Sequence, residues 1–449
     1  MTENRIQVGI SDDYLETAEF LDSEGRTINR EGVFVGSPTN VDAKAEVTNA
    51  TPADTDYGQI TRPVLDGQTL GVGGLTADAW GLQKVSLPHS LYHGLFTFDI
   101  PASMWFMYEN GTQVYTSTDI VSTNSAGVLT TTVTNPDLVL ESRECPRYQP
   151  NRGHHFATSV WCPSKTADGH REWGLRTVEN GVYFKLKADG LLYACLKSNS
   201  IETHEELIDT SGVTGFDVEK GNVYDIQYQW RGVGSYKFFV NLVEVHTLSL
   251  LGTLTALSME NPALPISFHC HRTTEDVAMH IGCADITSEA GRVDIEQYGS
   301  VYAEGVSVST NTPVIVVANP LQIGGETNTR TATLARISFT CSKKAVFKVW
   351  ASRNAGDITG ETLKDIGNGS YLQTDSTDMD ATAIRATAAT ISNMKFVTAV
   401  PVEAAVTQFR DNPFFGRIEF PVVRGDYLIV TCTAATAVAD VVVEWGEQI

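Results

Sequence analysis

The feature that most constrains the fold is a strict alternation of apolar and polar side chains. From Tyr224 to Trp230 every second residue is aromatic or aliphatic, and the residues between are Asp or Gln. A turn with two glycines follows, and residues 236–241 form another apolar run. Because side chains on a strand point alternately to opposite faces, this segment is typical of a β-hairpin with one buried face.

The same pattern recurs along the chain, whereas helical periodicity is scarce. Residues 182–187 and 191–195 flank an Ala-Asp-Gly turn, and two prolines precede a further strand-like segment at 266–270. Such short runs, separated by turn residues, predict strands. With 42% apolar and 19% charged residues, the composition is that of a globular protein. We therefore predict an all-β fold.

A chain of 449 residues exceeds what one hydrophobic core usually organises, so we expect several parts. Residues 1–70 are rich in acids and are predicted to form an extended arm, in which residues 12–21 suit a short helix. Residues 71–295 are predicted to form a central β-sandwich, and residues 296–449 a smaller antiparallel C-terminal β-sandwich, with a linker near 290–312.

The net charge of −22 argues against binding to nucleic acid or to anionic membranes, since both would repel the chain. No apolar run is long enough to span a membrane, and the first residues do not resemble a signal peptide. We therefore expect synthesis as a soluble protein in a cytoplasm. Seven scattered cysteines without a C-x-x-C pair predict reduced, mostly buried thiols.

The densest group of metal-binding residue types is His269-Cys270-His271, with His280 and Cys283 nearby. On a strand the two flanking histidines share one face, so at most two of the three adjacent residues reach one ion. His280 or Cys283 would then complete the site. Because this spacing is unlike that of known zinc sites, a strand with hydrogen-bonded histidines is favoured, and we predict no metal or cofactor.

Motifs for hydrolases and nucleotide-binding enzymes are missing. The sequence contains no G-x-S-x-G elbow, P-loop, H-E-x-x-H or compact strand-borne set of carboxylates. We therefore expect a protein without catalytic activity. An acidic loop at residues 375–380 suits calcium only weakly, because the glycine and the final glutamate of an EF-hand are missing.

Several segments resemble virion structural proteins of tailed bacteriophages. They are residues 78–85, 90–101, 146–154, 179–184 and 229–234, which together cover roughly residues 74–290. The resemblance implies a jelly-roll or concanavalin A-like β-sandwich of the kind used in capsid decorations, head fibres and tail appendages. It implies a structural component of the virion surface that assembles as a homotrimer or another symmetric homo-oligomer.

This resemblance leaves two functions open. The first is a capsid-surface decoration or head-fibre protein whose N-terminal arm docks on the major capsid protein or another virion protein. The alternative is a tail or baseplate appendage that binds host surface glycan through exposed aromatic side chains. Candidate stacking residues for a glycan are Trp105, Tyr108, Trp161 and Trp173, although burial is the commoner use of tryptophan in a β-sandwich.

A proline-stiffened segment with two arginines is a candidate contact region. Arg147 and Arg152 flank Tyr148 and a proline, and guanidinium groups pair well with carboxylates. We weigh two uses for this segment, namely pairs that brace the central sandwich itself and a contact between subunits. Arg147, Tyr148 and Arg152 are accordingly the candidate interface residues.

Overall fold

The structure of the protein is a computed structural model. It describes residues 88–448 except for positions 151, 251, 253–255, 290–295, 311, 353–363, 368–369, 375–394, 403–407 and 412–420. Before residue 88 it describes five short strands only: β1 (Asn4–Gln7), β2 (Tyr14–Leu21), β3 (Thr27–Glu31), β4 (Val64–Leu65) and β5 (Gln68–Thr69). The acidic loop at residues 375–380 lies outside the described residues.

The chain divides after Val72 into two compact units. In the first unit, β1, β2 and β3 pair antiparallel into a small sheet. The helix expected at residues 12–21 is wrong for Tyr14–Leu21, which form β2. Strand pairing accounts for the difference, since β2 is hydrogen-bonded on both edges. Beyond this sheet, the structure describes only β4 and β5 of the expected arm at residues 1–70, and these two strands pair antiparallel.

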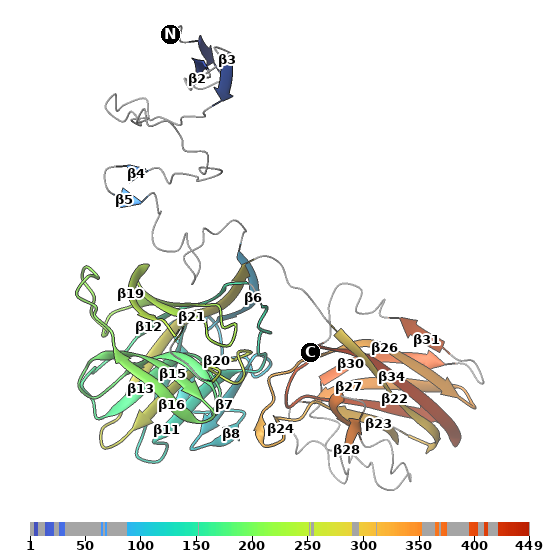
Figure 1. Ribbon diagram of the computed structural model, residues 1–449. Helices are drawn as coiled ribbons and strands as arrows, with labels where there is room; N and C mark the ends of the chain where they lie inside the picture. Colours follow the sequence, from blue (N-terminus) through green and yellow to red (C-terminus); the bar gives the residue numbers. More distant parts are fainter. Residues whose placement is uncertain are drawn as a thin grey trace. The chain divides into compact units, whose positions relative to one another are not determined.

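The central part of the second unit is a sandwich of two antiparallel eight-stranded sheets (Figure 1). Sheet 1 comprises β6 (Pro88–Leu95), β9 (Ile120–Thr123), β10 (Ala126–Thr130), β12 (His154–Trp161), β17 (Asn222–Tyr228), β18 (Tyr236–Val240), β19 (Val243–Leu248) and β21 (Ala278–Glu289). Sheet 2 comprises β7 (Trp105–Glu109), β8 (Thr112–Val114), β11 (Asp137–Ser142), β13 (Gly169–Arg176), β14 (Gly181–Leu186), β15 (Leu192–Ser198), β16 (Ile201–Leu207) and β20 (Ile266–Arg272). The all-β prediction is confirmed.

The core of this sandwich lies between the two sheets and is rich in aromatic side chains. Trp173 and Phe184 of sheet 2 each meet Tyr224 of sheet 1 edge-on, with ring centroids 4.9 and 5.2 Å apart. All three side chains are buried. The alternating residues of β17 thus turn their apolar face to the core, as the sequence pattern predicts.

Residues 296–448 form a second, smaller antiparallel sandwich. One sheet comprises β22 (Glu296–Val308), β26 (Ala332–Cys341), β31 (Gln408–Asp411), β32 (Pro421–Val422) and β34 (Ala437–Gln448). The other comprises β23 (Thr312–Ala318), β27 (Ala345–Ser352), β28 (Lys364–Gly367), β29 (Ser370–Thr374), β30 (Lys395–Val402) and β33 (Tyr427–Ala434), and a separate hairpin pairs β24 (Gln322–Ile323) with β25 (Glu326–Thr327).

The linker expected near residues 290–312 is wrong for most of its length. Glu296–Val308 form β22, which pairs with β34 and sends Val301, Ala303 and Val306 into the core. Tyr298 and Tyr302 on the same strand are exposed, so the outward face of β22 carries aromatic residues where an alternating strand would carry polar ones. A strand can therefore escape notice where its outward side chains are aromatic.

Buried ion pairs join the two sandwiches within the second unit. The loop between β32 and β33 brings Arg424 to the carboxylate of Glu141 and to the backbone carbonyls of Ser142 and Arg143 at the end of β11. The guanidinium of Arg143 lies 4.2 Å from the ring centroid of Phe106, on the face of sheet 2 that points away from the core. One end of that face is therefore covered.

Within the described residues, no helix has the length and hydrophobicity needed to cross a membrane. The seven cysteines are free thiols, and all but Cys283 are buried.

Candidate functional site

The outer face of sheet 2, which points away from the core, gathers ionisable side chains at the end opposite the junction with the second sandwich. Strands β11, β20 and β13 lie side by side, and their register sets Asp137 opposite His271, and His271 opposite His170. Two residues further along these strands, His269 is paired with Glu172. Because the neighbouring residues Leu138, Phe268 and Trp173 fill the core, strand alternation places these polar groups outside.

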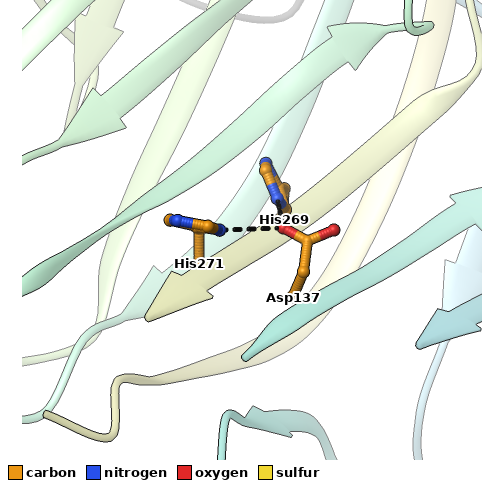
Figure 2. A group of neighbouring side chains, drawn as sticks. All are labelled: Asp137, His269 and His271. Atoms are coloured by element: carbon orange, nitrogen blue, oxygen red, sulfur yellow. Dashed lines mark hydrogen bonds and ion pairs between the residues drawn. The ribbon is translucent and has the colours of Figure 1, made fainter. Parts of the chain in front are cut away.

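Two histidines converge on one carboxylate oxygen. The Oδ1 atom of Asp137 lies 2.7 Å from Nε2 of His269 and 3.1 Å from Nδ1 of His271 (Figure 2). The side chains of Asp137 and His271 are 34% and 41% exposed, whereas that of His269 is 11% exposed. The group therefore opens to solvent on the side of His271.

A second layer supports His269 from the other side of its ring. The Nδ1 atom of His269 lies 3.1 Å from Oε2 of Glu172 and 2.9 Å from Nη1 of Arg176. Glu172 is buried and forms an ion pair with Arg176. His170 stacks on His271 with ring centroids 4.9 Å apart and approaches Oε1 of Glu172 at 3.6 Å. Together with Asp137, these five side chains therefore form one contiguous cluster of six.

The protonation state of this cluster follows from burial and pairing. Burial alone would raise the pKa of the Asp137 carboxyl, but the hydrogen bonds and charges of His269 and His271 lower it to about 2. Burial lowers the pKa of His269, and burial with the neighbouring His269 lowers the pKa of His170 to about 3. Near neutral pH the ionised Asp137 carboxylate therefore faces a neutral imidazole at His269, and His170 beside His271 is neutral as well.

Another ionisable group lies further along the same face. Cys195 of β15 lies near Glu202 and Glu205 of β16, within reach of one ion. Lys185 already binds both carboxylates, at 3.0 Å from Glu202 and 3.1 Å from Glu205. Burial and the charge of Glu202 raise the pKa of the Cys195 thiol. A protonated thiol beside paired carboxylates is a poor ligand set, so this group is a salt-bridge network.

The described residues also line a pocket next to the junction of the two sandwiches, which includes Tyr92, Met104, Arg143 and Asp426. Its polar groups are used internally. Arg143 binds Asp426 at 2.7 Å, and the Tyr92 hydroxyl donates to the carbonyl of Met104. The pocket is therefore a structural feature of the junction, and the Asp137 cluster remains the better candidate site.

No family model matches the chain, and no curated protein matches it. Among solved structures, the chain is similar to an endo-1,3-β-glucanase from Streptomyces sioyaensis, with 9% identity, 45% of this chain and 97% of that chain covered, and a TM-score of 0.35. It is also similar to an endo-β-1,3-glucanase from Pyrococcus furiosus, with 12% identity, 46% of this chain and 97% of that chain covered, and a TM-score of 0.33. The carbohydrate recognition domain of Emp47p is 10% identical, with 45% of this chain and 97% of that chain covered and a TM-score of 0.32. At such low identities and TM-scores, these proteins indicate nothing about what this chain binds or catalyses.

Two of the four aromatic residues proposed for glycan stacking are buried and cannot contact a glycan. Trp105 and Trp173 are at most 1% exposed and pack in the core between the sheets, so their selection as glycan platforms is wrong. The sequence alone does not show which face of their strands packs against the other sheet. Tyr108 lies on the outer face of sheet 2, half-buried, and Trp161 of sheet 1 stacks on His280 at 4.9 Å.

The candidate interface residues are placed mainly for internal packing. Tyr148 is buried and stacks on His154 and Tyr228, and Arg152 donates to the Gln149 side chain at 2.7 Å. Arg147 is half-buried. These contacts favour bracing of the central sandwich over a contact between subunits.

The histidines singled out in the sequence meet different partners from those expected. His269 and His271 share one face, as predicted, but His280 and Cys283 belong to β21 of the other sheet. Asp137 and His170, from neighbouring strands, take their place. No sequence signal identifies Asp137, which lies more than 130 positions away and joins the group only through the pairing of β11 with β20.

Proposed function

We propose that this chain is a structural component of a tailed-bacteriophage particle, a capsid-surface decoration or head-fibre protein that acts by assembly and display. The proposal rests on the resemblance of residues 74–290 to virion structural proteins. The observation that supports it best is the division of the chain after Val72 into an N-terminal unit and a larger body. A decoration protein needs such a separation between the part that docks and the part that is displayed.

The construction of the body suits display. Its two sandwiches are joined by ion pairs in which the arginine side chains of Arg143 and Arg424 are only 2% exposed. Such a junction, with the buried Phe106 ring beneath both guanidiniums, holds two modules as one rigid object. We expect this object to assemble as a symmetric homo-oligomer on the virion surface, with the N-terminal unit bound to the major capsid protein or another virion protein.

Deletion of residues 1–60 tests this function. The truncated protein should remain folded and oligomeric by light scattering and circular dichroism, but it should no longer bind particles that lack the protein. The full-length chain added to the same particles is the control. Attachment of the truncated protein at the full-length level would contradict the proposal.

The second candidate is a tail or baseplate appendage that binds host surface glycan. The observation that favours it is the polar outer face of sheet 2, where Asp137 and His271 are partly exposed and Tyr108 is half-buried. Binding to a glycan array that is weakened by Tyr108→Ala, with Trp161→Ala as the comparison on sheet 1, would support this candidate. A decoration protein predicts no specific signal.

We propose that either function proceeds without catalysis. The low pKa of Asp137, about 2, is the opposite of what a general acid in glycoside hydrolysis requires. Glu172 is held by Arg176 in an ion pair, which leaves it poorly placed as a nucleophile. Release of reducing ends from β-1,3-glucan or host polysaccharide by the purified protein would refute this statement.

A further inference from the structure

We propose that Asp137, His269 and His271 form a binding site for one divalent transition-metal ion of the zinc type. The residues come from β11 and β20 and present an Asp oxygen and two imidazole nitrogens that all lie within 4.8 Å of one another. Figure 2 shows the three side chains turned toward one point outside the sheet. This inference is independent of the function proposed above.

The distances suit the entry of an ion with only small movements. Zinc binds His nitrogen and Asp oxygen at about 2.0–2.2 Å, so two ligand atoms of a tetrahedral site lie about 3.3 Å apart. The Asp137 oxygen is 2.7 Å from the His269 nitrogen and 3.1 Å from the His271 nitrogen. The Asp137 oxygen therefore needs to move away from each nitrogen by up to about 0.6 Å, while the two nitrogens lie within 4.8 Å of each other. Side-chain rotation provides this, since Asp137 and His271 are partly exposed.

In the metal-free cluster, the positions of the imidazole hydrogens determine what must change when an ion enters. The Asp137 carboxylate is ionised, so each imidazole nitrogen facing it carries a hydrogen that it donates. When an ion lies between the three atoms, the carboxylate oxygen binds the ion in place of the two imidazole hydrogens. For both imidazoles to give a lone pair to the metal, the hydrogens on Nε2 of His269 and Nδ1 of His271 must move to the opposite nitrogens of the same rings, which keeps each ring neutral.

The surroundings of His269 satisfy its ring in both states. Without metal, Nε2–H donates to Asp137 and the unprotonated Nδ1 accepts from Arg176 at 2.9 Å. With metal on Nε2, the hydrogen resides on Nδ1 and is donated to Glu172 at 3.1 Å. A carboxylate behind the ligating histidine is the common arrangement of zinc sites, where it fixes the tautomer and strengthens the ligand. Glu172, buried and held by Arg176, is positioned for this use.

The site leaves room for a further ligand. Three protein ligands and an open position facing solvent are typical of zinc sites that exchange water or bind an external group. Here His271 is 41% exposed, and Asp137 lies at the opposite end of β11 from Glu141, which binds Arg424 at the buried junction. A bound ion is therefore reachable from outside the sandwich.

Titration of the full-length, EDTA-treated protein with Zn²⁺, and separately with Co²⁺, tests the site. We expect one tight ion per chain and visible absorption bands of Co²⁺ in a low-symmetry, His-containing site. His271→Ala should weaken binding at least 100-fold and abolish these bands, and Asp137→Asn should act in the same direction. The melting temperature of each variant without metal shows that it is folded.

The double variant His280→Ala/Cys283→Ser is the matched control, because it removes the exposed thiol and the histidine expected from sequence while leaving sheet 2 intact. It should bind like the unchanged protein. Glu172→Gln should still bind one ion, but 10- to 100-fold more weakly, as measured for carboxylates behind ligating histidines. Binding that persists in His271→Ala, or that disappears in the His280/Cys283 control, would overturn the proposal.

Discussion

The guanidinium of Arg143 lies 2.7 Å from the carboxylate of Asp426, and the two residues belong to different sandwiches. The Arg143 side chain is 2% exposed and also lies over the Phe106 ring. A buried charge of this kind is stable only while its partner is present, because its loss leaves the desolvated charge uncompensated. The junction between the sandwiches therefore depends on this pair and on the neighbouring pair of Arg424 with Glu141.

Asp426→Ala should lower the free energy of unfolding by about 3–5 kcal/mol, as expected for removal of one partner of a buried pair. Asp276→Ala is the matched control, since Asp276 pairs with Arg272 but is 58% exposed and should cost about 1 kcal/mol or less. Guanidinium unfolding of both variants measures the difference. Equal effects would show that the junction does not depend on the Arg143 pair.

His154 should make the central sandwich sensitive to mild acid. Burial, with a contribution from the charge of Arg152, lowers its pKa from 6.5 to about 4. Its Nε2 atom accepts a hydrogen bond from the backbone N–H of Gln149, which requires the neutral ring. Because the unfolded chain binds the proton first, stability is fully present above pH 6.5 and falls as the pH drops toward 4, by up to about 3 kcal/mol.

Urea unfolding between pH 7 and pH 4 checks this expectation. In His154→Gln the part of the pH dependence due to this residue should vanish, whereas His89→Gln, at an exposed position, should leave the profile unchanged. A profile of His154→Gln that parallels that of the unchanged protein would contradict the assignment.

The strands were predictable where one face is apolar and the other polar. Residues 224–230 follow that pattern strictly, and the structure confirms β17 with its aromatic face in the core. The pattern fails in β22, where Tyr298 and Tyr302 are exposed aromatic residues on the outward face. The alternation of apolar and polar residues therefore identified strands whose outer side chains are polar. It did not identify β22, whose outer side chains include aromatic residues.

The candidate site was only half predictable. His269 and His271 share a face because the period of a strand is two, which the sequence reveals. Asp137 reaches them through the register between β11 and β20, which depends on how distant segments pack. The same limit explains the errors over Trp105 and Trp173, since only the three-dimensional pairing shows which face of a strand meets the other sheet.

The two kinds of tryptophan should differ sharply when shortened. Trp173→Ala removes a fully buried ring that packs against Phe184 and Tyr224, so it should cost about 3–5 kcal/mol of unfolding free energy. Trp161→Ala removes a partly exposed ring stacked on His280 and should cost about 1 kcal/mol or less. Thermal unfolding of both proteins measures the contrast, and similar losses would show that the Trp173 site is not a tightly packed core.

The turn after β17 should tolerate no side chain at Gly234. A Cβ atom there would lie 1.7 Å from the carbonyl oxygen of Gln229 and 2.7 Å from that of Trp230, both backbone atoms that cannot move without opening the turn. Gly234→Ala should therefore destabilise the β17–β18 hairpin by several kcal/mol, since a steric clash that backbone atoms cannot relieve is among the costliest effects of single substitutions. Gly212→Ala, where nothing lies within 4 Å, should be close to neutral. Hydrogen exchange of β17 and β18 amides distinguishes the two, because only Gly234→Ala should accelerate it, and equal protection in both variants would refute the steric argument.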